Sequence, residues 1–258
     1  MQERHKNRMQ YFDEQAYTTQ KYVMPFINQS HQISNTDSVL EIGCGEAGNL
    51  KPFLALGCKC VGVDISENRI ENGKRFYQNT KNSENLTLLV SDIYDLKNVG
   101  TFDIIIIRDV IEHIHNQEIF IKKIADFMNE KTIVFVAFPP WQNPFGGHQQ
   151  NCDSKLLSHL PYFHILPKGW YKKILTWGGE DEAKVDSLLE IKDTRISIER
   201  FKRIISEDFD VKSFTYYIIN PNYEVKFGLK PWKSYVLKYL PYFRNYFTTC
   251  IYCTFSKK

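Results

Sequence analysis

Apolar and polar residues alternate in blocks along the first 138 positions, and these blocks predict strands and helices in turn. Short apolar runs rich in β-branched residues are typical of strands, and they occur at 39–42, 58–65, 86–90, 102–107 and 132–138. The segments between them are interpreted as helices at 46–56, 66–79 and 117–129. An amphipathic helix at 9–31 is expected to precede the first strand.

This order of elements predicts a parallel sheet. Strands that alternate with helices build α/β folds in which helices cover both faces of the sheet. The run 102–107, FDIIII, is almost entirely apolar, as expected of a strand that is buried on both faces. A capped helix at 197–207 and two late strands, near 211–220 and 246–256, complete the pattern. We therefore predict an α/β fold with a doubly wound, mostly parallel seven-stranded sheet whose last strand is antiparallel.

A single domain over 1–258 is expected, with an N-terminal helical segment at 1–36 and an interruption after the fifth strand. Residues 139–195 contain Pro, Gly, Trp and His but no clear strand. We interpret this segment as an aromatic-rich insertion or lid. Its aromatic side chains could wall a pocket for an apolar or sugar-like group, form a small core of the insertion itself, or do both.

A glycine-rich turn follows the first strand. In SVLEIGCGEAGNL, at 38–50, the glycines Gly43, Gly45 and Gly48 have the spacing G-x-G-x-x-G, which lets a backbone approach a ligand closely. Asp64 ends the second strand, nineteen residues after Gly45, where a carboxylate binds ribose hydroxyls. Dinucleotides and S-adenosylmethionine (SAM) both require these features. The spacing alone therefore leaves both cofactors open.

The residue type at position 41, a glutamate, distinguishes between these two possible cofactors. Glu41 lies near the end of the first strand, where a carboxylate is buried and needs a partner. SAM offers an ammonium group on its methionine end, whereas a dinucleotide offers phosphates that would repel a carboxylate. The turn thus favours SAM.

The stretch VLEIGCGEAG resembles motif I of the class I SAM-dependent methyltransferases. The resemblance extends to VGVDIS at 61–66, SDIYDL at 91–96 and FDIIIIRDVIEHI at 102–114, and it covers residues 37–138. It implies a Rossmann-like fold, SAM as cofactor and S-adenosylhomocysteine (SAH) as product, and it suggests a branch similar to small-molecule and quinone-pathway enzymes.

The resemblance also implies a set of cofactor contacts. Asp64 is expected to accept hydrogen bonds from the ribose diol, and Asp92 to accept one from the adenine amino group. Ile65 and Ile93 are expected to pack against the adenine ring. The full expected set comprises Glu41, Gly43, Cys44, Gly45, Asp64, Ile65, Asp92, Ile93, Arg108 and Asp109.

Three histidines, His113, His115 and His148, are candidates for a base, and His113 and His148 are expected to be the catalytic groups. Methyl transfer requires a base only when the acceptor arrives protonated. His113 lies in the DVIEH run after the fourth strand, and His148 lies in GGHQ, just after the Pro-Pro-Trp turn that ends the fifth strand. Both positions are near the carboxyl edge of the predicted sheet, where ligands bind. Either histidine could instead be a structural hydrogen-bonding group.

No metal is expected, although one alternative stays open. If residues 109–113 are helical, Asp109, Glu112 and His113 share one face and could hold Mg²⁺, with His148 as a further ligand. The arrangement resembles the acid-x-x-Glu-His motif of metal-dependent O-methyltransferases, with Asp109 where those proteins often carry Glu. Many class I methyltransferases carry a similar run without a metal.

Charge is uneven along the chain, although the net charge is only +3. Residues 225–258 contain seven Lys or Arg, ten aromatic residues and no Asp or Glu. This region is either a solvated basic face or a surface for phosphate, nucleic acid or membrane headgroups.

The six cysteines lack zinc-site spacing, no apolar run approaches about 18 residues, and the N-terminus has no signal-like apolar core. A cytoplasmic protein with reduced thiols is expected. Cys250 and Cys253, three apart in a strand-like run, are expected to face opposite sides of the sheet.

The sequence thus predicts a SAM-dependent methyltransferase. The acceptor is expected to be a small molecule or a lipid-linked or glycan hydroxyl. The alternatives are a nucleic-acid methyltransferase, of the RNA 2′-O type and with or without a metal, and a SAM-binding module without catalysis. Peripheral membrane contact through 225–258 is a further expectation, and the oligomeric state is left open.

Overall fold

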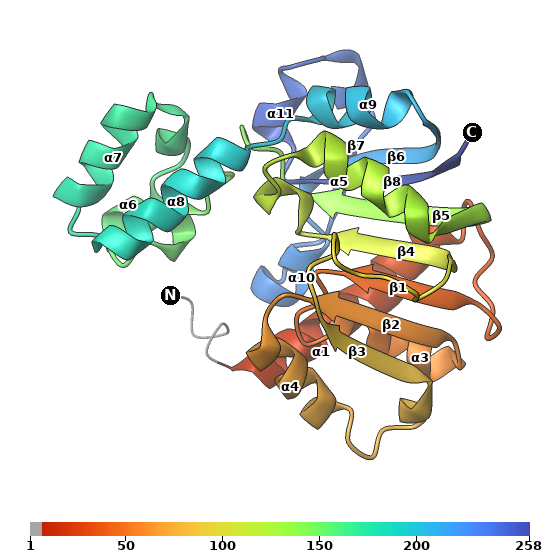
Figure 1. The fold of residues 1–258 in the computed structure, drawn as a ribbon. Helices are drawn as coiled ribbons and strands as arrows, with labels where there is room; N and C mark the ends of the chain where they lie inside the picture. The colour runs from red at the N-terminus through yellow and green to blue at the C-terminus, as the bar shows by residue number, and fades with distance from the viewer. Residues whose placement is uncertain (1–6) are drawn as a thin grey trace.

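One mixed sheet organises the chain, as Figure 1 shows for the computed structural model, which describes residues 7–258. The strand order is β3-β2-β1-β4-β5-β8-β6-β7. Strands β1 to β5 pair in parallel, and β8 lies antiparallel between β5 and β6. The strands span Ser38–Ile42 (β1), Lys59–Asp64 (β2), Leu86–Val90 (β3), Phe102–Arg108 (β4), Met128–Phe138 (β5), Phe209–Ile219 (β6), Trp232–Ser234 (β7) and Cys250–Lys257 (β8).

The predicted α/β class, the mostly parallel sheet and the antiparallel last strand are confirmed. The described residues add an eighth strand to the seven predicted, because the three residues of β7 pair with the end of β6. A segment this short carries no alternation of its own, so its pairing depends on the neighbouring strand.

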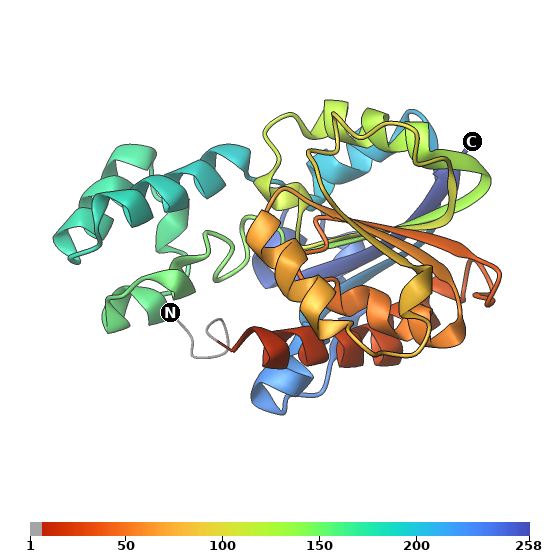
Figure 2. The same ribbon diagram turned by 60° about the horizontal axis from the view of Figure 1, so that its bottom comes forward.

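Helices cover both faces of the sheet (Figure 2). On one face lie α1 (Arg8–Thr18), α2 (Met24–Ile27), α3 (Lys51–Leu56) and α4 (Glu67–Phe76), and on the other lie α5 (Gln117–Ile124) and α9 (Ile198–Ser206). The period of two along a strand divides the core accordingly, since Leu40 and Ile42 pack with α5 and α9 while Val39 packs with the N-terminal helices.

The N-terminal helical segment is longer than α1 alone. A π-helical turn at Thr19–Val23 joins α1 to α2, so the predicted helix over 9–31 runs from Arg8 to Ile27. The first six residues of the predicted segment 1–36 lie outside the described residues. Three other helices are shorter than predicted, because α3 begins only at Lys51, α4 ends at Phe76, and α5 ends at Ile124 before a short 3-10 turn.

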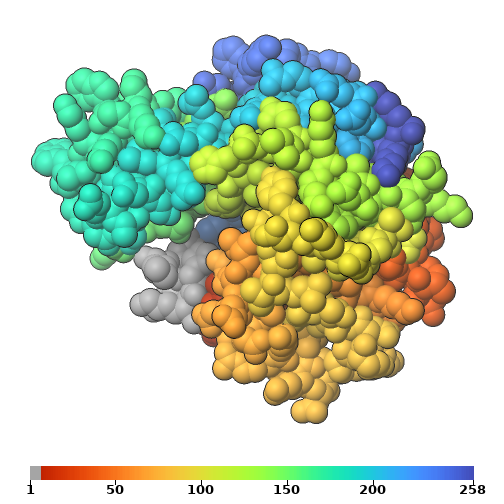
Figure 3. Space-filling model, in the orientation of Figure 1, coloured from red at the N-terminus to blue at the C-terminus, as the bar shows by residue number. Residues whose placement is uncertain are grey.

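The insertion after β5 is helical. It contains α6 (Lys155–His159), α7 (Lys168–Trp177) and α8 (Glu182–Thr194), and it stands beside the sheet as a separate lobe in Figures 1 and 3. Its buried residues form a cluster of their own, which includes Phe163, Tyr171 and Leu188. The expectation that some aromatic side chains form a small core within the insertion is therefore confirmed, whereas its role as a lid remains a prediction.

The late part of the chain adds two short helices, α10 (Asn222–Phe227) and α11 (Arg244–Phe247). On β8, Cys250 packs into one core and Cys253 into the other, as their spacing predicted. All six thiols are buried and none forms a disulfide. Within residues 7–258, none of the helices combines the length and hydropathy that crossing a bilayer requires.

Candidate active site

The chain order reverses between β1 and β4, which are neighbours in the sheet. Ligands of open α/β sheets bind at such a switch point, beside the carboxyl ends of the strands. Ile42 at the end of β1 pairs with Ile107 near the end of β4, so the turns that follow these two strands lie next to each other. The sequence motifs after β1, β2 and β4 therefore meet at one edge.

The glycine turn after β1 uses backbone conformations that other residues adopt at a cost. Gly43 has φ 68° and Gly45 has φ 55°, both in the left-handed region. A side chain at Gly43 would also lie 2.5 Å from a methyl group of Val110, in the loop after β4. The turn can therefore pass close to that loop only with glycine at this position.

The third glycine of the motif permits contact with α1. A Cβ atom at Gly48 would lie 2.5 Å from the backbone oxygen of Phe12. The helix predicted over 46–56 begins here as a 3-10 turn at Gly48–Leu50, because Ala47 has φ 63° and interrupts the helix. Arg8, also on α1, forms an ion pair with the buried Glu46. The N-terminal helix thus closes one side of the turn.

Glu41 is the most unusual group at this edge. It is 1% exposed. Its Oε1 accepts a hydrogen bond from Nδ2 of Asn49 at 2.6 Å, whereas Oε2 has no hydrogen-bond partner among residues 7–258. Burial raises the pKa of Glu41 to about 8. A buried carboxylate with one unpaired oxygen fits a cationic partner, such as the ammonium group of a bound SAM.

The side chain of Asn49 lies between the carboxylate of Glu41 and the buried guanidinium of Arg108, and it forms hydrogen bonds with both. Its Oδ1 accepts hydrogen bonds from Nη1 of Arg108 and from Oγ1 of Thr19, both at 2.8 Å. Arg108 also donates to the side chain of Asn222 on α10. The guanidinium is thereby held away from the unpaired carboxylate oxygen. Thr19 begins the π-helical turn, a feature that is frequent at functional sites.

Sequence reasoning missed Asn49, Thr19 and Asn222. Asn49 lies next to the last glycine of the motif, at the start of a helix that packs on the sheet. A polar side chain at such a buried position is a signal that could have identified it. The other two belong to segments distant in sequence, and only folding brings them to Arg108. Asn222 also lines a narrow recess, together with Tyr11, Glu14, Gln15, Thr18, Arg108, Asp109, Val225 and Lys226.

Asp64 lies at the end of β2, as predicted, and its carboxylate already holds the glycine turn. Its Oδ2 accepts a hydrogen bond from the backbone N–H of Gly45 and its Oδ1 one from that of Ser66, each at 2.8 Å. Each carboxylate oxygen can accept a second bond, so a diol fits without loss of the first two. Ile65, beside it, is 76% exposed and presents an apolar surface to solvent.

Asp92 and Ile93 follow β3 but differ in exposure. Asp92 is exposed and accepts a hydrogen bond from the backbone N–H of Tyr94 at 3.0 Å. Ile93 is 7% exposed and packs into the core beneath the sheet edge. It therefore anchors the loop, and its expected contact with adenine remains a prediction. Cys44, in the glycine turn, is buried as well.

Residues 109–113 do not form the helix that the metal alternative requires. Asp109 has φ 55°, and only Ile111–His113 forms a 3-10 turn. The carboxylate of Asp109 lies 3.8 Å from Nε of Arg108. Glu112 and His113 instead meet His148, and one ligand atom of each lies within 4.8 Å of the others.

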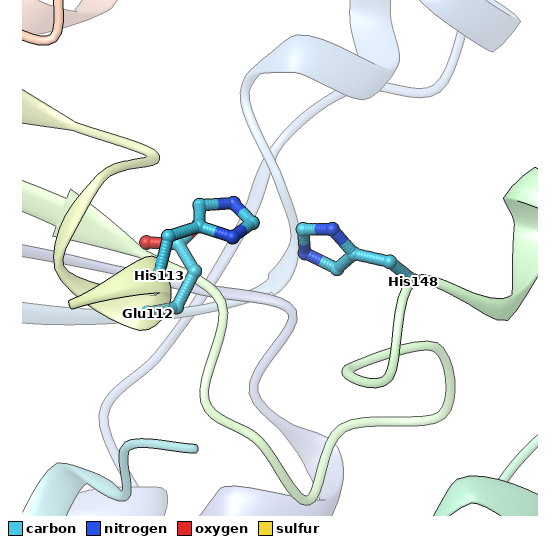
Figure 4. A group of neighbouring side chains, drawn as sticks. All are labelled: Glu112, His113 and His148. Atoms are coloured by element: carbon cyan, nitrogen blue, oxygen red, sulfur yellow. The ribbon is translucent and has the colours of Figure 1, made fainter. Parts of the chain in front are cut away.

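This cluster of Glu112, His113 and His148 joins two loops (Figure 4). The two imidazoles, from the loops after β4 and β5, face each other edge to face, with ring centroids 5.0 Å apart. Glu112 is 5% exposed, and neither of its carboxylate oxygens has a hydrogen-bond partner in the described part of the chain. The fold therefore brings together the two histidines that the sequence singled out.

The protonation states of the cluster follow from burial. Desolvation raises the pKa of Glu112 well above its usual range, and it lowers the pKa of His148 to about 3. His113 is exposed, and desolvation lowers its pKa while Asp109 opposes the shift. At pH 7 both imidazoles are neutral, but a group with a pKa of about 3 is a weak base, so His113 is the candidate proton acceptor of the pair.

Comparison with known proteins agrees with this geometry. Residues 11–182 match the model of a family described as a methyltransferase domain. The chain belongs to the class I SAM-dependent methyltransferases. Its cofactor is accordingly SAM, and the unpaired oxygen of Glu41 and the free acceptor capacity of Asp64 fit the two polar ends of that molecule.

Several relatives carry specific names. A ubiquinone biosynthesis O-methyltransferase of Rickettsia typhi is 23% identical over 206 residues, which are 76% of this chain and 78% of that protein. One of the same name from Pelagibacter ubique is 28% identical over 123 residues, which are 45% of this chain and 50% of the relative. The matched segment thus spans half the length of the Pelagibacter protein.

The fold is shared with a solved coclaurine N-methyltransferase bound to N-methylheliamine and SAH. The TM-score is 0.54 at 16% identity, over 91% of this chain and 72% of the solved one. At this identity the likeness shows the fold and carries no information on the acceptor.

Replacement of Asp64 by Ala is expected to weaken SAH binding by about 1–3 kcal/mol, because it removes charge-assisted hydrogen bonds to the ribose and loosens the turn at Gly45. Isothermal titration calorimetry measures the change. Asp126→Ala is the matched control, since Asp126 is an exposed carboxylate that pairs with Lys123 on the surface. An Asp64→Ala variant that binds SAH like the wild type would remove Asp64 from the cofactor site.

Removal of divalent metals is expected to leave activity unchanged. Glu112, His113 and His148 offer three donors that fit a metal ion, but burial raises the pKa of Glu112 well above its usual range, so its carboxyl group must give up a tightly held proton before it can bind a divalent cation. Metal content and turnover are measured before and after treatment with a chelator. Activity that is lost with the chelator and restored by Mg²⁺ would assign the cluster as a metal site.

Proposed function

We propose that the chain transfers the methyl group of SAM to a hydroxyl oxygen of a small-molecule, lipid-linked or glycan acceptor. The observation that carries the proposal is the pair of neutral imidazoles at His113 and His148, next to the cofactor edge. A hydroxyl acceptor arrives protonated and gains from a nearby base, whereas a neutral amine does not need one. The O-methyltransferase names of the Rickettsia and Pelagibacter relatives support the same direction.

The residues of the chain bind and orient the reactants. SAM, when bound, supplies a methyl group on a sulfonium, which is a good leaving group. Glu41 would hold the ammonium end and Asp64 the ribose, so that the chain fixes the cofactor from both sides. Alignment of two reactants in this way accounts for much of the rate that a methyltransferase needs to supply.

His113 would accept the proton from the acceptor hydroxyl. Of the two imidazoles it is the more exposed, and the carboxylate of Asp109 favours its protonated form. His148 packs edge to face against it and limits its orientation. His148 also lies within the insertion, between the end of β5 and α6, so closure of that lobe would exclude water from the same place.

The proposal is tested with SAM that carries a labelled methyl group and a panel of matched acceptors. Each pair in the panel differs only in a hydroxyl or an amino group on the same phenyl, lipid-linked or sugar scaffold. We expect label on oxygen in at least one scaffold and none on the matched amines. Label found only on nitrogen, or SAM binding with no transfer across the panel, would contradict the proposal.

A further inference from the structure

The segment 227–247 exposes its apolar side chains. Apolar side chains that are exposed in such number along one short segment often mark an interaction site. We call the following residues the C-terminal aromatic surface, and each is at least 39% exposed: Phe227, Leu229, Trp232, Tyr235, Val236, Tyr239, Leu240, Tyr242, Phe243, Tyr246 and Phe247.

Buried polar residues hold this segment in place. Arg244 is 6% exposed and donates hydrogen bonds to Glu199 at 2.8 Å and to the backbone oxygen of Lys238 at 3.2 Å. Asn245 is 1% exposed and accepts a hydrogen bond from the backbone N–H of Ile198 at 2.8 Å. Polar residues thus point inward and aromatic residues outward, which is the reverse of the usual pattern. The hydrogen bonds of Arg244 and Asn245 fix the backbone of the segment, and the aromatic side chains are exposed as a result.

The charges on this surface are all positive. Lys230, Lys233 and Lys238 are exposed among the aromatic residues, and the sequence has no Asp or Glu from 225 to its end. Two acidic groups on adjoining elements are already paired, since Glu199 binds Arg244 and Glu224 on α10 binds Lys21. The outward face is therefore both aromatic and cationic.

We propose that the C-terminal aromatic surface docks the protein on an anionic lipid bilayer. Trp and Tyr side chains are favoured at the headgroup level, where one part of the ring is apolar and the other wet. Lysines next to them add attraction to anionic headgroups, and their stems lie along the apolar surface. A second copy of the chain is a poorer occupant, because a symmetric contact would bring the lysines together and because protein interfaces are depleted in Lys.

The position of the surface relative to the active site adds a reason. The hydroxyl of Tyr162 in the insertion lobe donates to the backbone oxygen of Tyr246 at 3.0 Å, so the surface borders that lobe. Its other end begins on α10, whose Asn222 contacts Arg108. A bilayer docked here would lie beside both elements that adjoin the site, which suits a lipid-linked acceptor if the proposed function holds.

Vesicle co-sedimentation of the full chain tests docking without any use of catalysis. Phosphatidylcholine vesicles are compared with vesicles that also contain phosphatidylglycerol, at low and at high salt. We expect binding only with phosphatidylglycerol, and weaker binding as salt rises. The combined variant Lys230→Ala, Lys233→Ala and Lys238→Ala should bind about a hundredfold more weakly, since each lysine near an anionic surface contributes about fivefold.

The aromatic contribution is tested with Trp232→Ser and Phe243→Ser together, which should also bind the vesicles more weakly by about tenfold or more. The matched control is Trp170→Ser with Trp177→Ser on α7, because these side chains are 66% and 91% exposed but lie outside the surface. The control should bind like the wild type. Circular dichroism verifies that each variant is folded.

Four results would overturn the proposal. The chain could stay in solution with anionic vesicles at low salt, or the control variant could lose as much binding as the aromatic variant. RNA could bind through the same three lysines while vesicles do not. A concentration-dependent dimer that the aromatic substitutions abolish, again without vesicle binding, would assign the surface to a second copy of the chain.

Discussion

Glu41→Gln is expected to weaken the binding of SAM and SAH by about 2–5 kcal/mol, the usual effect of removing one partner of a buried charge pair. Gln keeps the length of the side chain and can still accept the hydrogen bond from Asn49, so the turn should keep its form. The only large loss is the negative charge opposite the cofactor's ammonium group. Calorimetric titration with SAH at pH 7 measures it.

The same substitution should stabilise the ligand-free protein at high pH. The pKa of Glu41 is about 8 in the folded chain and near 4.5 in an unfolded one, so the folded state binds more protons between these values. The contribution of this group to stability is therefore full below pH 4.5 and is lost as pH rises through 8. At pH 7 the loss is on the order of 3 kcal/mol. Glu41→Gln should recover it, and denaturant unfolding at pH 5 and pH 8 measures the difference.

Glu46→Gln is the matched control for both experiments. Glu46 is also a buried carboxylate in the glycine turn, but it already forms an ion pair with Arg8. Its loss should therefore destabilise the fold rather than stabilise it. If Glu41→Gln bound SAH as well as the wild type does, the carboxylate would have no role in cofactor binding. Equal stability of wild type and Glu41→Gln at pH 8 would show that burial of the charge is not costly.

His113→Ala is expected to lower kcat by about 10²–10⁴-fold on a hydroxyl acceptor, the range typical of a general base. SAH affinity should be unchanged, because no cofactor contact is removed. Wild-type kcat should fall as pH drops through the pKa of His113, which lies below its usual 6.5, and should be level above that range. The fall should be absent from the variant. Steady-state rates from pH 5 to 8 measure both effects.

His115→Ala provides the control, since His115 is exposed two residues further on and lies 3.6 Å from Glu190 on the insertion lobe. It should retain wild-type kcat. A His113→Ala variant with full activity, or with a pH profile like that of the wild type, would remove His113 from catalysis. His148→Ala should also lose activity, by disordering the ring of His113, but it should keep a fall in kcat at low pH.

The sheet could be predicted because its strands carry their own signal. The run 86–90 was predicted at the bounds that β3 has, and the apolar run 102–107 differs from β4 by one residue. Buried parallel strands must be apolar on both faces, so the sequence marks them directly. By contrast, β7 consists of three residues that are a strand only because β6 lies beside them.

The residues of the candidate site that belong to one sequence motif could be predicted. Those that tertiary packing brings to the site from distant segments could not. Glu41 and Asp64 were identified because their residue types are unusual at the ends of apolar strands. Residues 109–113 are not a helix, because the backbone of Asp109 is left-handed. The sequence around Asp109 does not indicate this conformation. The insertion helices were missed as well, although Ser154 and Asp181 cap α6 and α8 and were available as signals.

The ammonium end of the cofactor is expected to bind next to the ionised carboxylate of Glu41. The most direct test is calorimetric titration of the chain with SAH at pH 7, in two buffers that differ in ionisation enthalpy. Because Glu41 is mostly protonated at this pH when the site is free, we expect one binding site and release of close to one proton per SAH. Absence of binding, or binding without proton release, would contradict it.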